Sequence, residues 1–183
     1  MQTGDLKKKY IKEVLPKLKE KFGYKNELTV PKIKKVIVNT GFNIDVSKDK
    51  KILDAIINDL AAITGQKPVS TQAKKAIAGF KTRQGMVVGL KTTLRGNRMF
   101  NFVSRLINTA LPRTRDFRGL SPRSIDDGGN LSIGIKEHII FPEVSQEGLK
   151  RSFGLEVTIV SDAKTKQEAL ELFILLGFPI KHG

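Results

Sequence analysis

PVSTQAKKAIAGFKTRQGMVVGLKTTLR, residues 68–95, contains two strand patterns joined by a long segment of different composition. The flanks, 68–71 and 86–95, are rich in the β-branched residues that favour strands. The connection between them, 72–85, carries four basic side chains, one aromatic side chain and no acidic residue. Hairpin connections usually have about two to five residues, and much longer loops in compact domains usually carry function. The sequence therefore predicts a hairpin whose basic loop, 72–85, protrudes from the fold.

Further strand and helix patterns lie on both sides of this hairpin. KIKKVIVNTG (32–41) predicts a strand, and because both of its faces mix apolar and polar side chains we expect it at a sheet edge. Alternating apolar residues predict two more strands, over 131–137 and 153–161. Apolar residues at helical spacing predict helices over 5–22, where Pro16 should cause a kink or restart, and over 47–65, 97–111 and 165–177.

The order of these elements indicates the fold class. Strands and helices do not alternate strictly, and several strands look hairpin-linked. Such an order favours an antiparallel sheet over a parallel one. We therefore expect an α+β fold, a two-layer sandwich in which helices cover one face of a mainly antiparallel sheet. The length of 183 residues predicts a single domain, 1–183.

Positive charge is concentrated in the middle of the chain. The sequence has 33 Lys and Arg against 18 Asp and Glu, a formal net charge of +15. Residues 60–115 carry 11 basic side chains and no acidic one, whereas residues 116–183 carry 8 basic and 10 acidic side chains. Such a window stores repulsion within the fold, so it favours a polyanionic partner, nucleic acid or an anionic membrane, over a merely solvated charged face.

Several other classes of function find little support in the residues. The chain has no cysteine, which removes disulfides, thiolate nucleophiles and Cys-ligated zinc. It has neither an apolar run of roughly 18 residues nor a signal-peptide core, and no helix pairs a basic face with exposed aromatics, so we expect a cytoplasmic protein without a membrane partner. We expect no enzyme activity, cofactor or metal site. His138 should lie at the surface or core edge, and Asp126 and Asp127 should hydrogen-bond the backbone of their own turn.

RNA fits the charge pattern better than duplex DNA does. A sheet with flexible basic loops suits the wide minor groove and unpaired bases of RNA, and the sequence contains no recognisable recognition helix. In the loop, basic side chains can bind phosphates and Phe80 can stack on bases. Outside it, amides can read base edges, hydroxyls can bind ribose, and lysines and arginine can bind phosphate. These candidates are Lys32, Lys34, Lys35, Asn39, Gln66, Lys91, Thr92, Thr93 and Arg95.

The chain resembles the bacterial family of large-subunit ribosomal protein five, which binds 5S rRNA. The resemblance lies in KVIVNTG, TGQKPVSTQAKKAIAGFKTRQG, TTLRGNRMFNFVSRLINTALPRTRDFRG and GIKEHIIFPE. It implies a protein of the central protuberance that helps to attach 5S rRNA to 23S rRNA and contacts P-site tRNA through a protruding loop. The implied protein partners are neighbouring large-subunit proteins and a small-subunit protein at an intersubunit bridge.

The resemblance also implies roles for individual residues. The part that faces 5S rRNA corresponds to Asn39, Thr40, Gln66, Thr92, Thr93 and Arg95. The loop that contacts tRNA corresponds to Lys74, Lys75, Phe80, Lys81 and Arg83. The chain departs from the family where Ala76 replaces a common serine, where Val87 replaces a usual proline, and in the turn SIDDGGNLS, which lacks an arginine and a tyrosine. We therefore expect a non-enzymatic ribosomal RNA-binding protein, with a general RNA chaperone or nucleic-acid-binding module as the alternative.

Overall fold

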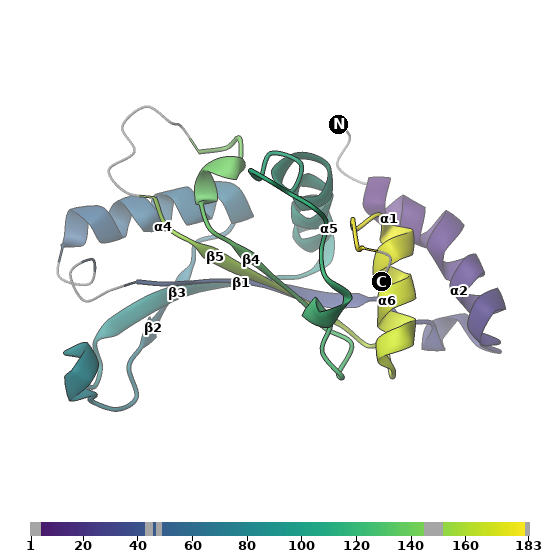
Figure 1. Ribbon diagram of the computed structural model, residues 1–183, viewed down its shortest axis with the longest axis horizontal. Helices are drawn as coiled ribbons and strands as arrows, with labels where there is room; N and C mark the ends of the chain where they lie inside the picture. The colour runs from purple at the N-terminus through teal and green to yellow at the C-terminus, as the bar shows by residue number, and fades with distance from the viewer. Residues whose placement is uncertain (1–4, 43–45, 47–48, 145–151, 182–183) are drawn as a thin grey trace. The chain divides into compact units, whose positions relative to one another are not determined.

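The computed structural model describes residues 5–42, 46, 49–144 and 152–181 (Figure 1). Its strands form a five-stranded sheet in the order β2-β3-β1-β5-β4. The strands are β1 (Ile33–Gly41), β2 (Val69–Gln72), β3 (Val87–Leu94), β4 (Leu131–Ile135) and β5 (Leu155–Ser161).

Hydrogen bonds show that neighbouring strands run antiparallel. β2 and β3 pair as an antiparallel hairpin. Between β1 and β5, the carbonyl of Lys32 accepts from the N–H of Asp162 at 3.2 Å. Further along β1, the hydroxyl of Thr40 donates to the carbonyl of Gly154 at 2.7 Å. The end of β1 therefore lies beside the start of β5, and the two strands run antiparallel. The predicted α+β fold with a mainly antiparallel sheet is confirmed.

Helices form the second layer of this sandwich. The α-helices are α1 (Asp5–Lys9), α2 (Leu15–Phe22), α4 (Lys50–Thr64), α5 (Gly96–Arg105) and α6 (Lys166–Leu176). π-helical turns η1 (Tyr10–Val14) and η4 (Leu106–Ala110) link α1 to α2 and extend α5. Short 3-10 turns are η2 (Glu27–Thr29), η3 (Ala78–Phe80), η5 (Pro122–Ser124) and η6 (His138–Ile140). No helix among the described residues is long and apolar enough to cross a membrane.

Local sequence sets the ends of the helices. Asp49 caps α4, since its carboxylate accepts a backbone N–H of the first turn at 2.9 Å. Gly65 ends α4 in the left-handed conformation, with φ at 69°. Pro16 has no N–H to donate, and the helix widens to a π-helical turn just before it. In this turn the N–H of Leu15 donates to the carbonyl of Tyr10. The predicted restart of this helix is confirmed.

Alternation along the strands divides the sheet into a covered face and an open face. On β5, Leu155, Val157 and Ile159 are buried, whereas Glu156 between them is exposed. β4 shows the same pattern of buried and exposed positions. Successive side chains of a strand point to opposite faces, so apolar residues at every second position bury one face only. The other face carries exposed polar residues, such as Glu156, together with some partly exposed apolar residues, such as Ile37.

The position of β1 corrects one prediction. β1 is the middle strand of five, not the expected edge strand. Val36 and Val38 are buried on the covered face, whereas Ile37 and Asn39 keep partial exposure on the open face. The mixed pattern therefore comes from a central strand with one uncovered face, which sequence alternation alone cannot distinguish from an edge.

The described chain forms two compact units. Unit 1 contains Met1–Val36, Arg95–Ile133 and Thr158–Gly183, and unit 2 contains Ile37–Leu94 and Gly134–Val157. Each unit therefore combines segments that are distant in the sequence. The expectation of a single domain stays a prediction.

Gly89 provides a test of strand packing in unit 2. A Cβ atom at this position would lie 2.6 Å from the carbonyl oxygen of Thr40 and 2.9 Å from the hydroxyl of Thr71. Because a backbone oxygen cannot swing aside, Gly89→Ala should lower the free energy of unfolding by about 1–3 kcal/mol. Denaturant titration measures this change. Gly134→Ala on β4 is the matched control, since its Cβ meets no described atom within 4 Å; equal stability of the two variants would contradict the packing.

Candidate nucleic-acid interface

The open face of unit 2 begins with β3. Leu90, Thr92 and Leu94 are buried on the covered face, where α4 packs against β3. Lys91 is exposed and Thr93 is half-buried on the opposite face. Strand alternation thus presents a lysine and a hydroxyl side by side along one strand, without an acidic neighbour on that strand.

The strands beside β3 extend this face. On β1, Asn39 is half-buried and Gly41 is exposed. On β2, Val69 pairs with Lys91 and Thr71 pairs with Gly89, so these side chains share one face. From here on, the name open face means only the part of the uncovered side that β1, β2 and β3 form in unit 2. It consists of Ile37, Asn39, Gly41, Val69, Thr71, Gly89, Lys91 and Thr93.

The composition of the open face suits a nucleic acid. These residues of β1, β2 and β3 provide a lysine, an amide and two hydroxyl groups, and the one exposed carboxylate on the same side of the sheet in unit 2 is that of Glu156 on β5. Gly41 is exposed, so a ligand can approach the backbone closely there, whereas Gly89 is buried. Val69 is 67% exposed, which leaves an apolar side chain for contact with a base or sugar. Phosphate, base and ribose can therefore all find a partner on this surface.

Gln66 lies beside the open face, after the end of α4. Its side-chain amide donates to the carbonyl of Thr93 at 3.4 Å. The turn is fixed by Thr64, whose buried hydroxyl donates to the carbonyl of Leu60 at 2.7 Å. The structure thus brings together four sequence-predicted contact residues that are exposed or half-buried: Asn39, Gln66, Lys91 and Thr93.

Two other sequence-predicted contact residues point to the covered face. Thr40 is only 2% exposed, and its hydroxyl is occupied by the carbonyl of Gly154. Thr92 is 1% exposed, and its hydroxyl has no hydrogen-bond partner among the described residues. Neither side chain can reach an RNA on the open face, so the predicted RNA contacts of Thr40 and Thr92 are not possible there. The period of two along a strand, applied from a known buried neighbour, would have separated Thr92 from Thr93.

Four further predicted contact residues belong to unit 1 and not to the open face. Lys34 is exposed and pairs with Asp162, with 3.2 Å between the ammonium and the carboxylate. The same carboxylate accepts the backbone N–H of Lys32 at 2.6 Å. Lys35 is half-buried, and Arg95 is exposed just after β3. A predicted cluster of strand lysines is thus partly neutralised within the protein.

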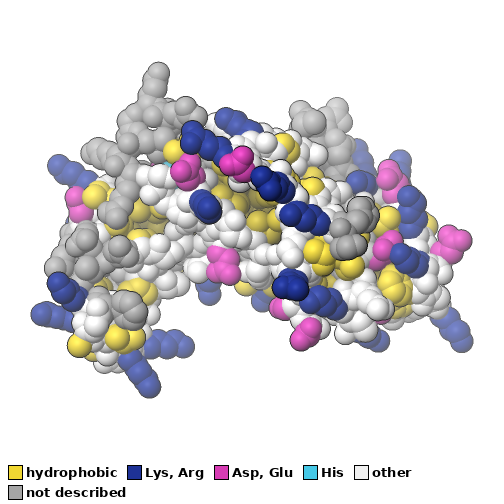
Figure 2. Space-filling model, in the orientation of Figure 1, with side chains coloured by type: hydrophobic (Ala, Val, Ile, Leu, Met, Phe, Trp, Pro, Cys, Tyr) yellow, Lys and Arg dark blue, Asp and Glu magenta, His cyan; other side chains and the backbone are white. Residues whose placement is uncertain are grey.

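The β2–β3 connection, residues 73–86, is organised by its own backbone. The N–H of Ala73 donates to the carbonyl of Met86 at 2.8 Å, and the N–H of Gly85 donates to the carbonyl of Ala73 at 2.9 Å. Nearer the tip, Ile77 and Thr82 exchange two hydrogen bonds of 3.2 Å each around the turn η3. Over this part of the chain, Figure 2 shows Lys and Arg side chains and no Asp or Glu. The predicted protrusion of this connection stays a prediction.

The basic side chains of this connection are free. Lys74, Lys75, Lys81 and Arg83 are all exposed and have no ion pair or side-chain hydrogen bond among the described residues. The side chain of Phe80, the predicted stacking residue, lies outside what the structure describes. Ile77, which the sequence did not single out, is 51% exposed and adds an apolar side chain to the segment.

His138 is the clearest correction among the titratable residues. It is fully buried in unit 2 rather than at the surface, and its ring stacks on Phe153 with 3.8 Å between centroids. Its Nδ1 accepts the backbone N–H of Phe153 at 3.3 Å. Burial lowers the pKa of His138 below 6.5, although Asp59, 3.6 Å from Nε2, opposes this shift. The neutral ring is therefore part of the core.

The buried ring should make stability depend on pH. As the pH falls below 6.5, the unfolded chain takes up a proton on His138 before the folded protein does. The free energy of unfolding should therefore decline as the pH falls through this range. His138→Asn keeps an acceptor near the Nδ1 position and cannot titrate, so its unfolding curve should lose this part of the pH dependence. Identical pH dependence in both proteins would contradict the buried neutral state.

Of the two carboxylates in the acidic turn of unit 1, Asp126 forms the predicted hydrogen bond to the backbone, whereas Asp127 forms none with a described residue. The carboxylate of Asp126 accepts the backbone N–H of Asn130 at 2.7 Å and its side-chain amide at 2.9 Å. These hydrogen bonds lower the pKa of Asp126. Asp127 is exposed in the same turn. The described residues contain no group of histidines and carboxylates that could hold a metal ion.

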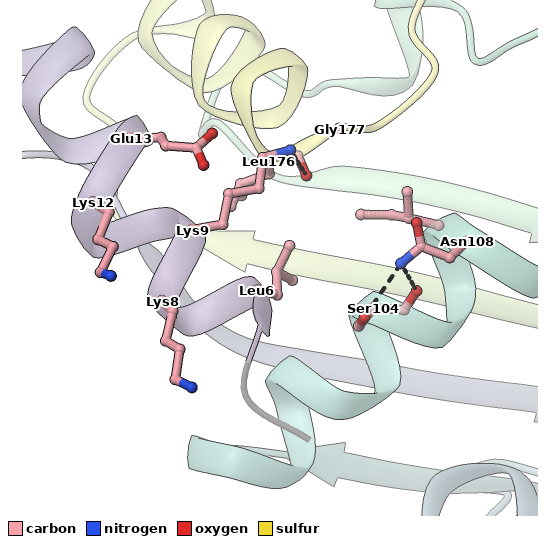
Figure 3. Close-up of a pocket in the computed structure, with 10 residues that line it drawn as sticks. Leu6, Lys8, Lys9, Lys12, Glu13, Ser104, Asn108, Leu176 and Gly177 are labelled. Atoms are coloured by element: carbon pink, nitrogen blue, oxygen red, sulfur yellow. Dashed lines mark hydrogen bonds between the residues drawn. The ribbon is translucent and has the colours of Figure 1, made fainter. Parts of the chain in front are cut away.

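A pocket of about 400 Å³ in unit 1 offers no chemistry of its own. In Figure 3, Lys8 and Lys12 point away from it, whereas Lys9 extends toward the C-terminal end of α6. The ammonium of Lys9 donates to the carbonyl of Leu176 at 3.2 Å, a favourable position for a cation at a helix C-terminus. Asn108 donates to Ser104 across a neighbouring turn. Lys9 thus joins two helices through its hydrogen bond, whereas the hydrogen bonds of Asn108 stay within its own helical segment.

Comparison with known proteins identifies relatives along nearly the whole chain. The family model of ribosomal protein L5 matches residues 26–83, and the model of the C-terminus of the same ribosomal family matches residues 87–180. Large ribosomal subunit protein uL5 of Halothermothrix orenii is 51% identical over 174 residues, which cover 95% of this chain and 97% of the relative. The uL5 protein of Desulforamulus reducens is 52% identical, with 95% and 96% covered. Protein uL5c of Spinacia oleracea is 52% identical and covers 97% of this chain and 69% of the relative.

Proposed function

Because the chain belongs to the ribosomal protein L5 family, we propose that it is a structural constituent of the large subunit of the cytoplasmic ribosome and binds 5S rRNA. The family consists of structural ribosomal components and not of enzymes. The observation that carries the proposal is the open face of unit 2, where an amide, a lysine and a hydroxyl lie together on β1 and β3 and neither strand carries a carboxylate. By holding 5S rRNA, the protein helps to attach it to 23S rRNA.

Each residue of the proposed 5S site has a distinct task. Lys91 neutralises a phosphate, and its long stem lets the ammonium follow the backbone of the RNA. The amide of Asn39 and the hydroxyl of Thr93 provide hydrogen bonds to a base edge and to a ribose 2′-hydroxyl. Gln66 is held against the carbonyl of Thr93, so its position is set before RNA binds. Arg95 belongs to unit 1, and its exposed guanidinium is proposed separately to bind a phosphate or a guanine.

The β2–β3 connection is proposed to bind P-site tRNA. Its four basic side chains have no partner within the described protein and are free to bind phosphates. The internal hydrogen bonds of the connection hold its backbone in shape, so less entropy is lost when RNA binds.

Point variants test the 5S site. Asn39→Ala should weaken 5S rRNA binding by about 1–3 kcal/mol, by analogy with well-made contacts to bases. Lys91→Gln should reduce the slope of log affinity against log salt by about 0.7–0.9, the share of one phosphate. Lys164→Gln is the control, because this exposed lysine lies in unit 1 and its loss changes the net charge equally. Filter binding across a salt series measures both effects, and unchanged affinity in both site variants would remove the site assignment.

A deletion tests the separate role of the connection. Removing residues 74–83 joins Ala73 to Gln84 and leaves a two-residue turn, whose Gly85 already has a positive φ of 81°. The hydrogen bond between Ala73 and Met86 can then close a short hairpin. We expect unchanged 5S rRNA affinity and faster loss of tRNA from the P site of assembled ribosomes.

A second variant separates charge from length in this experiment. Changing Lys74, Lys75, Lys81 and Arg83 to glutamine keeps the connection intact and removes its charge. It should lose tRNA as the deletion does if phosphate binding is responsible. Loss of 5S rRNA binding in either variant would mean that the two surfaces have been assigned in reverse.

A further inference from the structure

The lysines of the β2–β3 connection lie in surroundings without negative charge. Lys74, Lys75 and Lys81 belong to residues 60–115, which carry no acidic side chain. All three are exposed, and none has an ion pair or side-chain hydrogen bond among the described residues. In Figure 2, the Lys and Arg side chains of this part of the chain extend into solvent. Their ammonium groups are therefore accessible to a small reagent as well as to RNA.

Other accessible lysines of the protein have a carboxylate beside them. Three such ion pairs, all within unit 1, are Lys19–Glu27 at 2.9 Å, Lys21–Glu171 at 2.6 Å and Lys34–Asp162 at 3.2 Å. The lysine side chains of these pairs are 37%, 57% and 52% exposed, so solvent reaches them too. A neighbouring carboxylate repels an anionic reagent, whereas an acid-free cluster of cations attracts it. The two groups of lysines therefore differ in charge environment more than in access.

The backbone of the connection keeps Lys81 close in sequence to a guanidinium. Lys81 has a left-handed φ of 51° directly after η3, and its N–H donates to the carbonyl of Ala78 at 2.9 Å. The next residue, Thr82, exchanges two hydrogen bonds of 3.2 Å with Ile77. Arg83 follows, and its guanidinium can bind a phosphate with two parallel hydrogen bonds. A phosphate held by Arg83 brings the rest of a small reagent to the lysines of this short segment.

We propose that Lys74, Lys75 and Lys81 form an acylation site that reacts with acyl phosphates, which are small anionic acyl donors. The four cationic side chains of the connection raise the local concentration of the anion and the rate of its encounters. The neutral form of a lysine amine then attacks the carbonyl carbon of the donor. An N–C bond forms, the C–O bond to the phosphate breaks, and inorganic phosphate leaves with the bonding electron pair. The amine nitrogen gives one proton to water.

Acylation of the connection should weaken its contact with tRNA. The reaction converts an ammonium into a neutral amide, so each modified lysine loses its attraction for a phosphate. The supply of acyl phosphate would thereby set how firmly the connection holds tRNA. This consequence rests on the proposed function, whereas the acylation itself depends only on the charge and exposure of the three lysines.

Two acyl donors of different charge test the proposal. The full-length protein is treated at low salt with acetyl phosphate or with the neutral ester N-hydroxysuccinimidyl acetate, and mass spectrometry gives the acetylation rate of each lysine. The ratio of the two rates removes differences in exposure and amine reactivity. This ratio should be about three- to tenfold higher for the connection lysines than for the three carboxylate-paired lysines. At about 1 M salt, where the Debye length is about 3 Å, the ratios should agree within about twofold.

A matched pair of variants makes the experiment specific. Arg83→Gln removes one cation of the connection and should lower the ratio at Lys81 about two- to threefold. Arg113→Gln removes equal charge from an exposed position in unit 1 and should leave that ratio unchanged. Equal ratios for connection and carboxylate-paired lysines at low salt would overturn the proposal. So would a preference for the connection that persists unchanged at high salt.

A tRNA measurement separates this proposal from the proposed function. Protein that has been acetylated at the connection is assembled into ribosomes, and faster loss of P-site tRNA is expected than with unmodified protein. Selective acylation without any change in tRNA loss would contradict the tRNA contact but support the acylation site. Unselective acylation, together with faster tRNA loss in the glutamine variant of the connection, would remove the acylation site and leave the tRNA contact in place.

Discussion

The structure depends on a sheet that is apolar on one face only. Alternate residues of β1, β3, β4 and β5 are buried beneath helices, and that burial stabilises the sheet. The same alternation places every intervening side chain on the uncovered side. Polar, small and basic residues therefore lie on that side because the core uses the alternate positions. Since the core holds the strands in place, it also sets the spacing of these side chains.

The electrostatics of the chain add a second constraint. Residues 60–115 carry no acidic side chain, and their basic groups repel one another in the isolated protein. Where acids are present, as at Asp162, they neutralise nearby lysines within the protein. Basic groups without such partners remain on the open face and on the β2–β3 connection. An RNA that supplies phosphates to these surfaces removes the repulsion and gains affinity through released counterions.

Much of the fold could be predicted from local sequence. The helix predicted over 47–65 and the restart near Pro16 depend on neighbouring residues alone, and the capping carboxylate of Asp49 and the left-handed Gly65 show how local sequence ends such a helix. The central position of β1 could not be predicted, because alternation does not record which strands lie beside it. Similarly, Thr92 and Thr93 have equal chemistry, and the period of two along β3 separates them only once one buried neighbour on that strand is known. His138 was misplaced because its contacts with Phe153 and Asp59 come from distant parts of the sequence.

Competition between RNAs tests the central claim most directly. The protein, bound to labelled 5S rRNA, is mixed with a large mass excess of unlabelled unrelated RNA. The salt concentration is held at about 0.15 M, where long-range attraction between charges is screened. Retention of the labelled 5S rRNA is predicted, because the open face combines phosphate contacts with shape and hydrogen bonding. If the unlabelled RNA displaces 5S rRNA to the extent expected from its mass excess alone, the surface binds any polyanion. That result would contradict specific binding of 5S rRNA by the open face.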